Sequence, residues 1–198
     1  MATGKRGLAH ISEVIREVFD QLQLTERLSM PPITIPKTII LAIDPGPEQS
    51  AVVLYDPVKR VVMSHGKHDN YEIRDDLGMC SNWYSDLVIE MVASYGKPVG
   101  AETFETCVWI GRFIEASPDP DSVVRIERKD VKMHLCQATA NVTDAVIRQR
   151  LIDLFGPGKD KAIGKKACPG PLYGIKADCW QALALAVTYA DKLAGAAP

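Results

Sequence analysis

The chain has 198 residues, 46% of them hydrophobic and 24% charged, which describes one ordinary globular domain with a short appendage. No apolar run approaches the ~20 residues of a membrane-spanning helix, and no signal-peptide region opens the chain, so we expect a cytoplasmic protein without membrane association. The five cysteines form no Cys-x-x-Cys pair, and we expect reduced thiols. The net charge of -2, taken over the whole chain, gives no indication of a nucleic-acid partner.

The first predicted domain, residues 1–36, is an amphipathic helix followed by a linker. Apolar residues recur at helical spacing over residues 8–24, with charged residues between them. The proline-rich segment of residues 29–36 cannot continue this helix. Its apolar stripe needs a covering surface, which we expect to be the body of the chain or a second copy. A separate protein partner is the alternative.

The second predicted domain, residues 37–198, begins with a continuous apolar run at residues 38–44. Continuous hydrophobicity is typical of a strand covered on both faces, at the centre of an α/β sheet. Further strands are predicted at 50–55, 60–64, 87–92 and 123–126, and helices at 71–84, 101–116, 131–136, 144–155 and 176–193. Residues 156–174 are predicted to form a loop. The order of elements favours an α/β fold in which helices cover both faces of a mixed sheet.

Charge is unevenly distributed along this second domain. Residues 125–178 contain eleven lysines and arginines against six acids, a net charge of +5, which leaves -7 for the rest of the chain. Such asymmetry indicates either a surface for a polyanion beside an acidic cluster or ordinary solvated charge.

Three carboxylates occupy positions where acids are unexpected. Asp44 ends the first apolar strand, Glu90 lies inside the strand 87–92, and Asp178 lies on the first turn of the final helix. Asp44 could instead serve an Asp-Pro-Gly turn and Asp178 a helix N-terminus, whereas Glu90 has neither explanation. A buried ionised carboxylate costs several kcal/mol unless it is paired or binds a metal. Carboxylates from two strands and a helix suit Mg²⁺ or Mn²⁺, which prefer oxygen ligands.

Five short motifs follow one another along the second domain. They are Ile40-Leu41-Ala42-Ile43-Asp44-Pro45-Gly46, Leu87-Val88-Ile89-Glu90, Gly111-Arg112, Val131-Lys132 with Val146-Ile147-Arg148, and Lys176-Ala177-Asp178 with Ala182-Leu183-Ala184. In this order, over residues 38–192, the chain resembles the RuvC-like Holliday-junction resolvases of the RNase H-like superfamily. The resemblance implies an RNase H-like mixed sheet carrying an N-terminal helical extension.

The resemblance also implies a site and a reaction. Asp44, Glu90 and Asp178 would be the catalytic residues and would bind two Mg²⁺ or Mn²⁺ ions that hydrolyse a phosphodiester of branched DNA without a covalent intermediate. The residues expected to contact DNA phosphates are Lys132, Arg148, Lys159, Lys161, Lys165, Lys166 and Lys176. Because a four-way junction has two-fold symmetry and resolvases of this class cut as dimers, the resemblance implies a homodimer.

Two departures from the family pattern leave alternatives open. Gln181 stands where the family has a further acid, and Asp144 stands where the family is usually basic. Asp144 would serve as N-terminal charge on its helix, or contribute a fourth acid from another direction. The alternatives are an RNase H-like nuclease acting on flaps, forks or RNA–DNA hybrids, and a catalytically silent junction-binding protein. An actin-like ATPase is disfavoured by the poor glycine pattern after Asp44.

Overall fold

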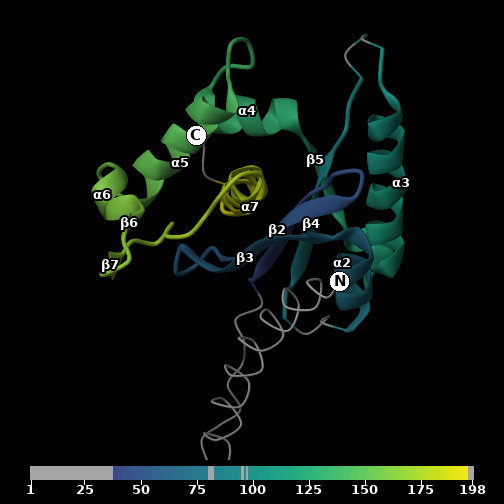
Figure 1. Cartoon of the computed structure of the whole chain (residues 1–198), viewed down its shortest axis with the longest axis horizontal. Coiled ribbons are helices and arrows are strands. Elements are labelled where there is room, and N and C mark those ends of the chain that lie inside the picture. Colours follow the sequence, from purple (N-terminus) through teal and green to yellow (C-terminus); the bar gives the residue numbers. More distant parts are fainter. Residues whose placement is uncertain (1–37, 80–82, 95, 97, 196–198) are drawn as a thin grey trace, which may run out of the picture. The chain divides into compact units, whose positions relative to one another are not determined.

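Five strands form one mixed sheet in the order β3-β2-β1-β4-β5, and helices cover both of its faces (Figure 1). This computed structural model describes residues 38–79, 83–94, 96 and 98–195. The strands are β1 (Ile40–Asp44), β2 (Gln49–Asp56), β3 (Val61–Asp69), β4 (Asp86–Met91) and β5 (Val124–Glu127), with a small second sheet of β6 (Gly164–Lys165) and β7 (Cys168–Pro169). The helices are α2 (Asn70–Met79), α3 (Ala101–Ala116), the 3₁₀ turn η1 (Pro120–Ser122), α4 (Arg128–Cys136), α5 (Asp144–Phe155), α6 (Lys159–Ala162) and α7 (Cys179–Leu193).

Strand β1 lies at the centre of the sheet, as its continuous apolar sequence predicts. It pairs antiparallel with β2 and parallel with β4, which in turn pairs parallel with β5. Ile40, Ala42 and Ile43 are fully buried because both faces of the strand are covered. The predicted α/β fold with a mixed sheet is confirmed.

Each face of the sheet has its own hydrophobic core. On one face, Ile43 and Ile89 pack with side chains of α2 and α3. On the other face, Ala42 and Val88 pack with side chains of α4, α5 and α7. Figure 1 shows α2 and α3 on one side of the strands and α4, α5 and α7 on the other. Because side chains alternate along a strand, the two sets of residues reach opposite faces.

Helix α7 is buried along most of its length because it lies between the sheet and the helices α4 and α5. Every residue from Cys179 to Tyr189 is buried, which agrees with a sequence that is apolar around the whole helix. The helix begins at Cys179 rather than at the predicted residue 176. Ala177 has a φ of 44°, in the left-handed region, and a right-handed helix cannot continue through it.

The structure differs from the sequence prediction at β3, which extends to Asp69 instead of ending at residue 64. Residues 65–69 are mostly polar, so hydrophobic alternation does not reveal them, yet each pairs with β2. The helix predicted over residues 71–84 has the described bounds Asn70–Met79.

The segment predicted to be a loop, residues 156–174, contains α6 and the β6–β7 hairpin. The chain after the hairpin packs directly on α6: the amide of Gly170 donates to the carbonyl of Ile163, and that of Leu172 donates to Ala162, both at 2.8 Å. A Cβ atom at Gly170 would lie 2.4 Å from the carbonyl oxygen of Lys161, so this close approach requires glycine. The segment is therefore an ordered substructure rather than a loop.

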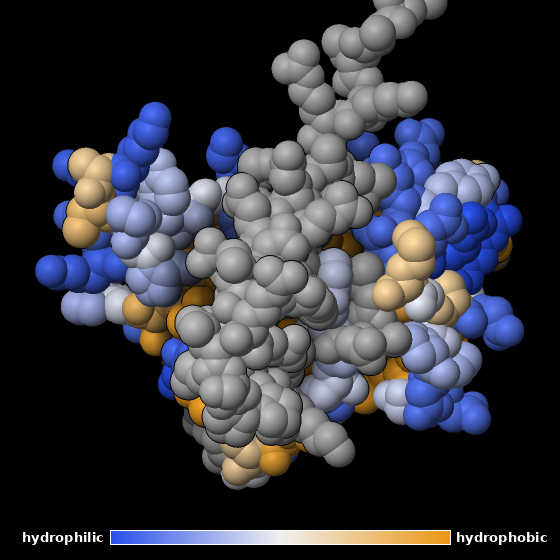
Figure 2. All heavy atoms as spheres, turned by 90° about the horizontal axis from the view of Figure 1, so that it is seen from below, coloured by the Kyte–Doolittle hydropathy of each residue, from blue (hydrophilic) through white to orange (hydrophobic). Residues whose placement is uncertain are grey.

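Among the described residues, hydrophilic ones predominate at the left and at the right of the space-filling view (Figure 2). No helix in the described part of the chain is long and apolar enough to cross a membrane. The predicted N-terminal helix of residues 8–24 and its linker lie outside the described residues.

Candidate functional site

Asp44 and Glu90 lie side by side at the ends of the two central strands. Strands β1 and β4 are parallel with Ile43 opposite Ile89, so Asp44 and Glu90 occupy the next level of the sheet. Both follow, by two residues, side chains that belong to the core under α7. Side-chain alternation therefore directs both carboxylates to the α7 face.

Asp178 reaches the same region from the residue that precedes α7. Its Oδ2 lies 2.6 Å from the Nζ of Lys67, and the ammonium donates a hydrogen bond to it. Lys67 lies opposite Ala51 on β2, and Ala51 lies opposite Asp44 on β1. One row across the sheet thus carries Lys67, Asp44 and Glu90.

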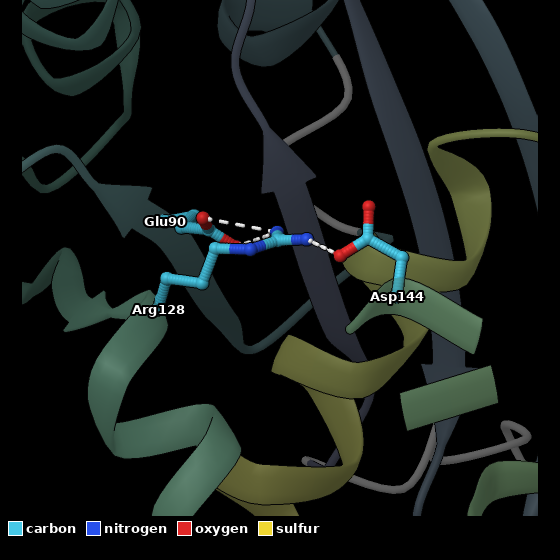
Figure 3. Close-up of polar contacts among 3 residues, drawn as sticks. All are labelled: Glu90, Arg128 and Asp144. Atoms are coloured by element: carbon cyan, nitrogen blue, oxygen red, sulfur yellow. Dashed lines mark hydrogen bonds and ion pairs between the residues drawn. The ribbon is translucent and has the colours of Figure 1, made fainter. Parts of the chain in front are cut away.

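Arg128, the first residue of α4, connects Glu90 to Asp144 (Figure 3). Its Nη1 lies 3.3 Å from each carboxylate oxygen of Glu90, and its Nη2 lies 2.5 Å from Oδ1 of Asp144. Asp144 is the first residue of α5. The structure therefore brings Asp144 to the Glu90 side of the row, whereas Asp178 pairs with Lys67.

The carboxylates act on one another electrostatically. Burial raises the pKa of Asp44 to about 8, and the charges of Glu90, Asp178 and Asp144 add to this rise while Arg128 opposes it. Burial also raises the pKa of Glu90, again against the effect of Arg128. For Arg128 itself, burial lowers the pKa, but Glu90 and Asp144 together raise it above its ordinary value. Four acids and the cations Arg128 and Lys67 therefore form a single charged cluster, which we call the carboxylate cluster.

The chemistry of the carboxylate cluster suits a divalent metal ion. Its donors are hard oxygen atoms, four acids face two cations, and burial raises the pKa of Asp44. Within the described residues, no group of three or more His, Cys, Asp or Glu side chains is arranged to hold a metal ion. In this arrangement an oxygen of Asp178 forms an ion pair with Lys67, and oxygens of Glu90 and Asp144 form ion pairs with Arg128.

The turn after Asp44 is fixed by a buried hydrogen-bond network. The Ser50 hydroxyl accepts a bond from the amide of Gly46 and donates one of 2.6 Å to Oδ1 of Asn70, whose Nδ2 donates to the carbonyl of Gly46. Ser50 and Asn70 are fully buried. A Cβ at Gly46 would lie 2.4 Å from the carbonyl oxygen of Gln49. These contacts hold the main chain next to Asp44 in one conformation.

The residues predicted to contact DNA are distributed over several elements. Lys132 on α4 is half-buried and lines a cavity of about 400 Å³ together with Arg128, Lys129 and Thr139. Arg148 on α5 is exposed, and its guanidinium stacks on the ring of Trp180 at 4.8 Å. The remaining lysines are exposed on α6, on the β6–β7 hairpin and before α7: Lys159, Lys161, Lys165, Lys166 and Lys176.

Three residues of this region, Lys67, Asn70 and Arg128, were not predicted from the sequence. Lys67 lies on a polar strand extension whose existence the hydrophobic pattern did not reveal. Arg128 follows β5, the strand next to β4, so the order of strands would have placed it near Glu90. No sequence pattern indicates the buried role of Asn70.

Comparisons with known proteins agree with this architecture. No protein-family model and no curated protein matches the chain. Among solved structures, Thermus thermophilus RuvC matches with a TM-score of 0.56 and 14% identity, covering 81% of this chain and 98% of that chain. T. thermophilus RuvC in complex with Holliday junction substrate matches with a TM-score of 0.58 and 15% identity, over the same shares of the two chains. The described body therefore has a fold like that of RuvC, as the sequence motifs implied.

Proposed function

We propose that the protein is a metal-dependent, structure-selective endonuclease that cleaves Holliday junctions or other branched DNA. The observation that carries the proposal is the carboxylate cluster, in which Asp44 and Glu90 lie adjacent on the two central strands. The fold supports it, because RuvC with a Holliday junction substrate shares this architecture.

In this proposal Asp44, Glu90 and Asp178 hold Mg²⁺ or Mn²⁺, with Asp144 available as a fourth acid. The bound ions would supply an activated water molecule and neutralise the leaving 3′-oxygen. The network of Ser50, Asn70 and Gly46 keeps Asp44 oriented. Lys132, Arg148 and the exposed lysines of the α6–β7 segment bind backbone phosphates, so recognition depends on the shape of the DNA rather than on its bases.

A cleavage assay on a synthetic four-way junction tests this function. We expect nicks with Mg²⁺ or Mn²⁺ and none with EDTA, and we expect Asp44→Asn to reduce the rate at least ~100-fold. Cleavage of flaps, forks and RNA–DNA hybrids in parallel defines the preferred substrate. Equal rates for Asp44→Asn and the unchanged protein would disprove the mechanism.

The second candidate is a junction-binding protein without catalytic activity. It is favoured by Gln181, a buried amide on α7 in place of a carboxylate. This alternative predicts junction binding that is the same with EDTA and with Mg²⁺, and no cleavage even above the pKa of Asp44. The same substrates and buffers therefore distinguish the two candidates.

A further inference from the structure

Arg128 occupies a position in the carboxylate cluster that a divalent metal ion could take. Its guanidinium faces both oxygens of Glu90, whose side chain is only 13% exposed. The 3.3 Å distances to Glu90 exceed the 2.7–2.9 Å usual for charge-assisted hydrogen bonds. The closer partner, Asp144, has a side chain that is 69% exposed, and exposed ion pairs contribute little free energy. Arg128 therefore neutralises the cluster through a long ion pair with the buried Glu90 and a close ion pair with the exposed Asp144.

The same arginine also lines the cavity of about 400 Å³ that adjoins the cluster. Its other lining residues are Lys129, Lys132 and Thr139, so the described lining offers three cations and a hydroxyl donor. Three cations and a hydroxyl, with no carboxylate among these described lining residues, fit a phosphodiester of a nucleic acid. The guanidinium of arginine binds phosphate through two parallel hydrogen bonds, which the lysines cannot do.

We propose that Arg128 is an internal counterion that gives way to a divalent cation at Glu90 and Asp144 and then binds a phosphodiester in the adjoining cavity. This inference rests on the proposed function and adds a DNA-binding residue to it. Without metal, the guanidinium neutralises the acids and is withheld from DNA. With metal, the bound cation neutralises the acids instead, and the Arg128 side chain becomes available to bind the phosphate. Metal binding and DNA binding are then coupled, each strengthening the other.

The first test measures Ca²⁺ binding by calorimetry without DNA, so it does not depend on cleavage. At about pH 8.5, where Asp44 is largely ionised, we expect Arg128→Ala to bind Ca²⁺ roughly tenfold more tightly than the unchanged protein, because a competing cation is gone. Arg128→Lys, which keeps the charge but cannot bridge two carboxylates, should be intermediate. Arg125→Ala removes the same charge from an exposed β5 position and should change the affinity by less than about twofold.

The second test measures the affinity of a fluorescent four-way junction with EDTA and with Ca²⁺. The unchanged protein should bind more tightly with Ca²⁺ than with EDTA, and Arg128→Ala should lose most of that gain. Lys129→Ala, which lines the same cavity without an ion pair to Glu90 or Asp144, should weaken binding equally in both buffers. Circular dichroism confirms that each variant is folded.

The outcomes separate this inference from the proposed function. If Arg128→Ala binds Ca²⁺ no more tightly, or weakens junction binding equally in both buffers, the counterion role is wrong even when the unchanged protein cleaves junctions. If the unchanged protein binds Ca²⁺ weakly, Arg128→Ala binds it tightly and neither cleaves, the inference holds and the nuclease function fails. If neither protein binds Ca²⁺, the exchange is also wrong.

Discussion

A carboxyl group that retains its proton in the folded chain makes the stability of the metal-free protein depend on pH. Asp44 has a pKa of about 8 when folded, against 3.8 for an ordinary aspartate. Between these values the folded state holds a proton that the unfolded state has released. The free energy of unfolding therefore falls as the pH rises from about 4 to about 8, by about 1.4 kcal/mol for each pKa unit at most.

Asp44→Asn removes this titration, which gives a direct prediction. In EDTA, the variant should be more stable than the unchanged protein by a few kcal/mol near pH 8, and by clearly less near pH 5. Urea unfolding at the two pH values measures the difference. A stability difference that is the same at both values would show that Asp44 is not the group responsible.

At the scale of elements, helix α3 exposes apolar side chains on the outside of the sheet. Phe104 is 61% and Val108 is 48% exposed, and they are four residues apart on one helix face. Gly111 continues this face, and a Cβ there would meet only open space. The exposed Glu105 and Arg112 lie along one side of this row, before and after Val108, so an antiparallel second copy would place opposite charges together. In the homodimer that the proposed cleavage of a two-fold symmetric junction implies, we expect this face to be the contact.

The dimer contact predicts that Phe104→Glu converts the protein to a monomer in sedimentation equilibrium. The control is Val58→Glu, which places the same charge at an apolar side chain, 70% exposed, between β2 and β3. It should leave the mass unchanged. If Phe104→Glu stays dimeric, or the unchanged protein is a monomer at every concentration, α3 is not the contact.

At the scale of the whole molecule, the net charge of -2 is the sum of opposed parts. The +5 of residues 125–178 includes the exposed lysines of α6 and the hairpin, whereas the carboxylate cluster draws Asp44 and Glu90 from outside that range.

We expect junction affinity to fall steeply with salt. Replacing Lys165 and Lys166 by alanine should reduce the slope of log affinity against log salt by about 1–2, since each phosphate contact contributes about 0.9. An unchanged slope would remove the hairpin from the DNA surface.

The pattern of apolar residues predicted most strands and helices because buried positions of an element require apolar side chains at regular spacing. The two helices at 101–116 and 144–155 have the predicted bounds, and Asp44 and Glu90 were expected on buried strands that the structure places side by side. The ion pairs were not predictable in this way. Lys67 and Arg128 reach acids 111 and 38 residues away along the chain, so only the tertiary fold brings them together. Polar partners leave no periodicity in the sequence.

The contact of Gly170 with α6 affects the thermodynamics of binding as well as the fold. An exposed flexible segment loses conformational entropy when it settles on a ligand, and that loss weakens the affinity. Because the backbone after the hairpin is already bonded to Ile163 and Ala162, the segment's main chain is ordered before any ligand arrives. The lysine side chains of the segment then remain to be ordered on binding: Lys159, Lys161, Lys165 and Lys166. A larger residue at position 170 would therefore weaken DNA binding by freeing the segment, although it lies on none of the proposed phosphate contacts.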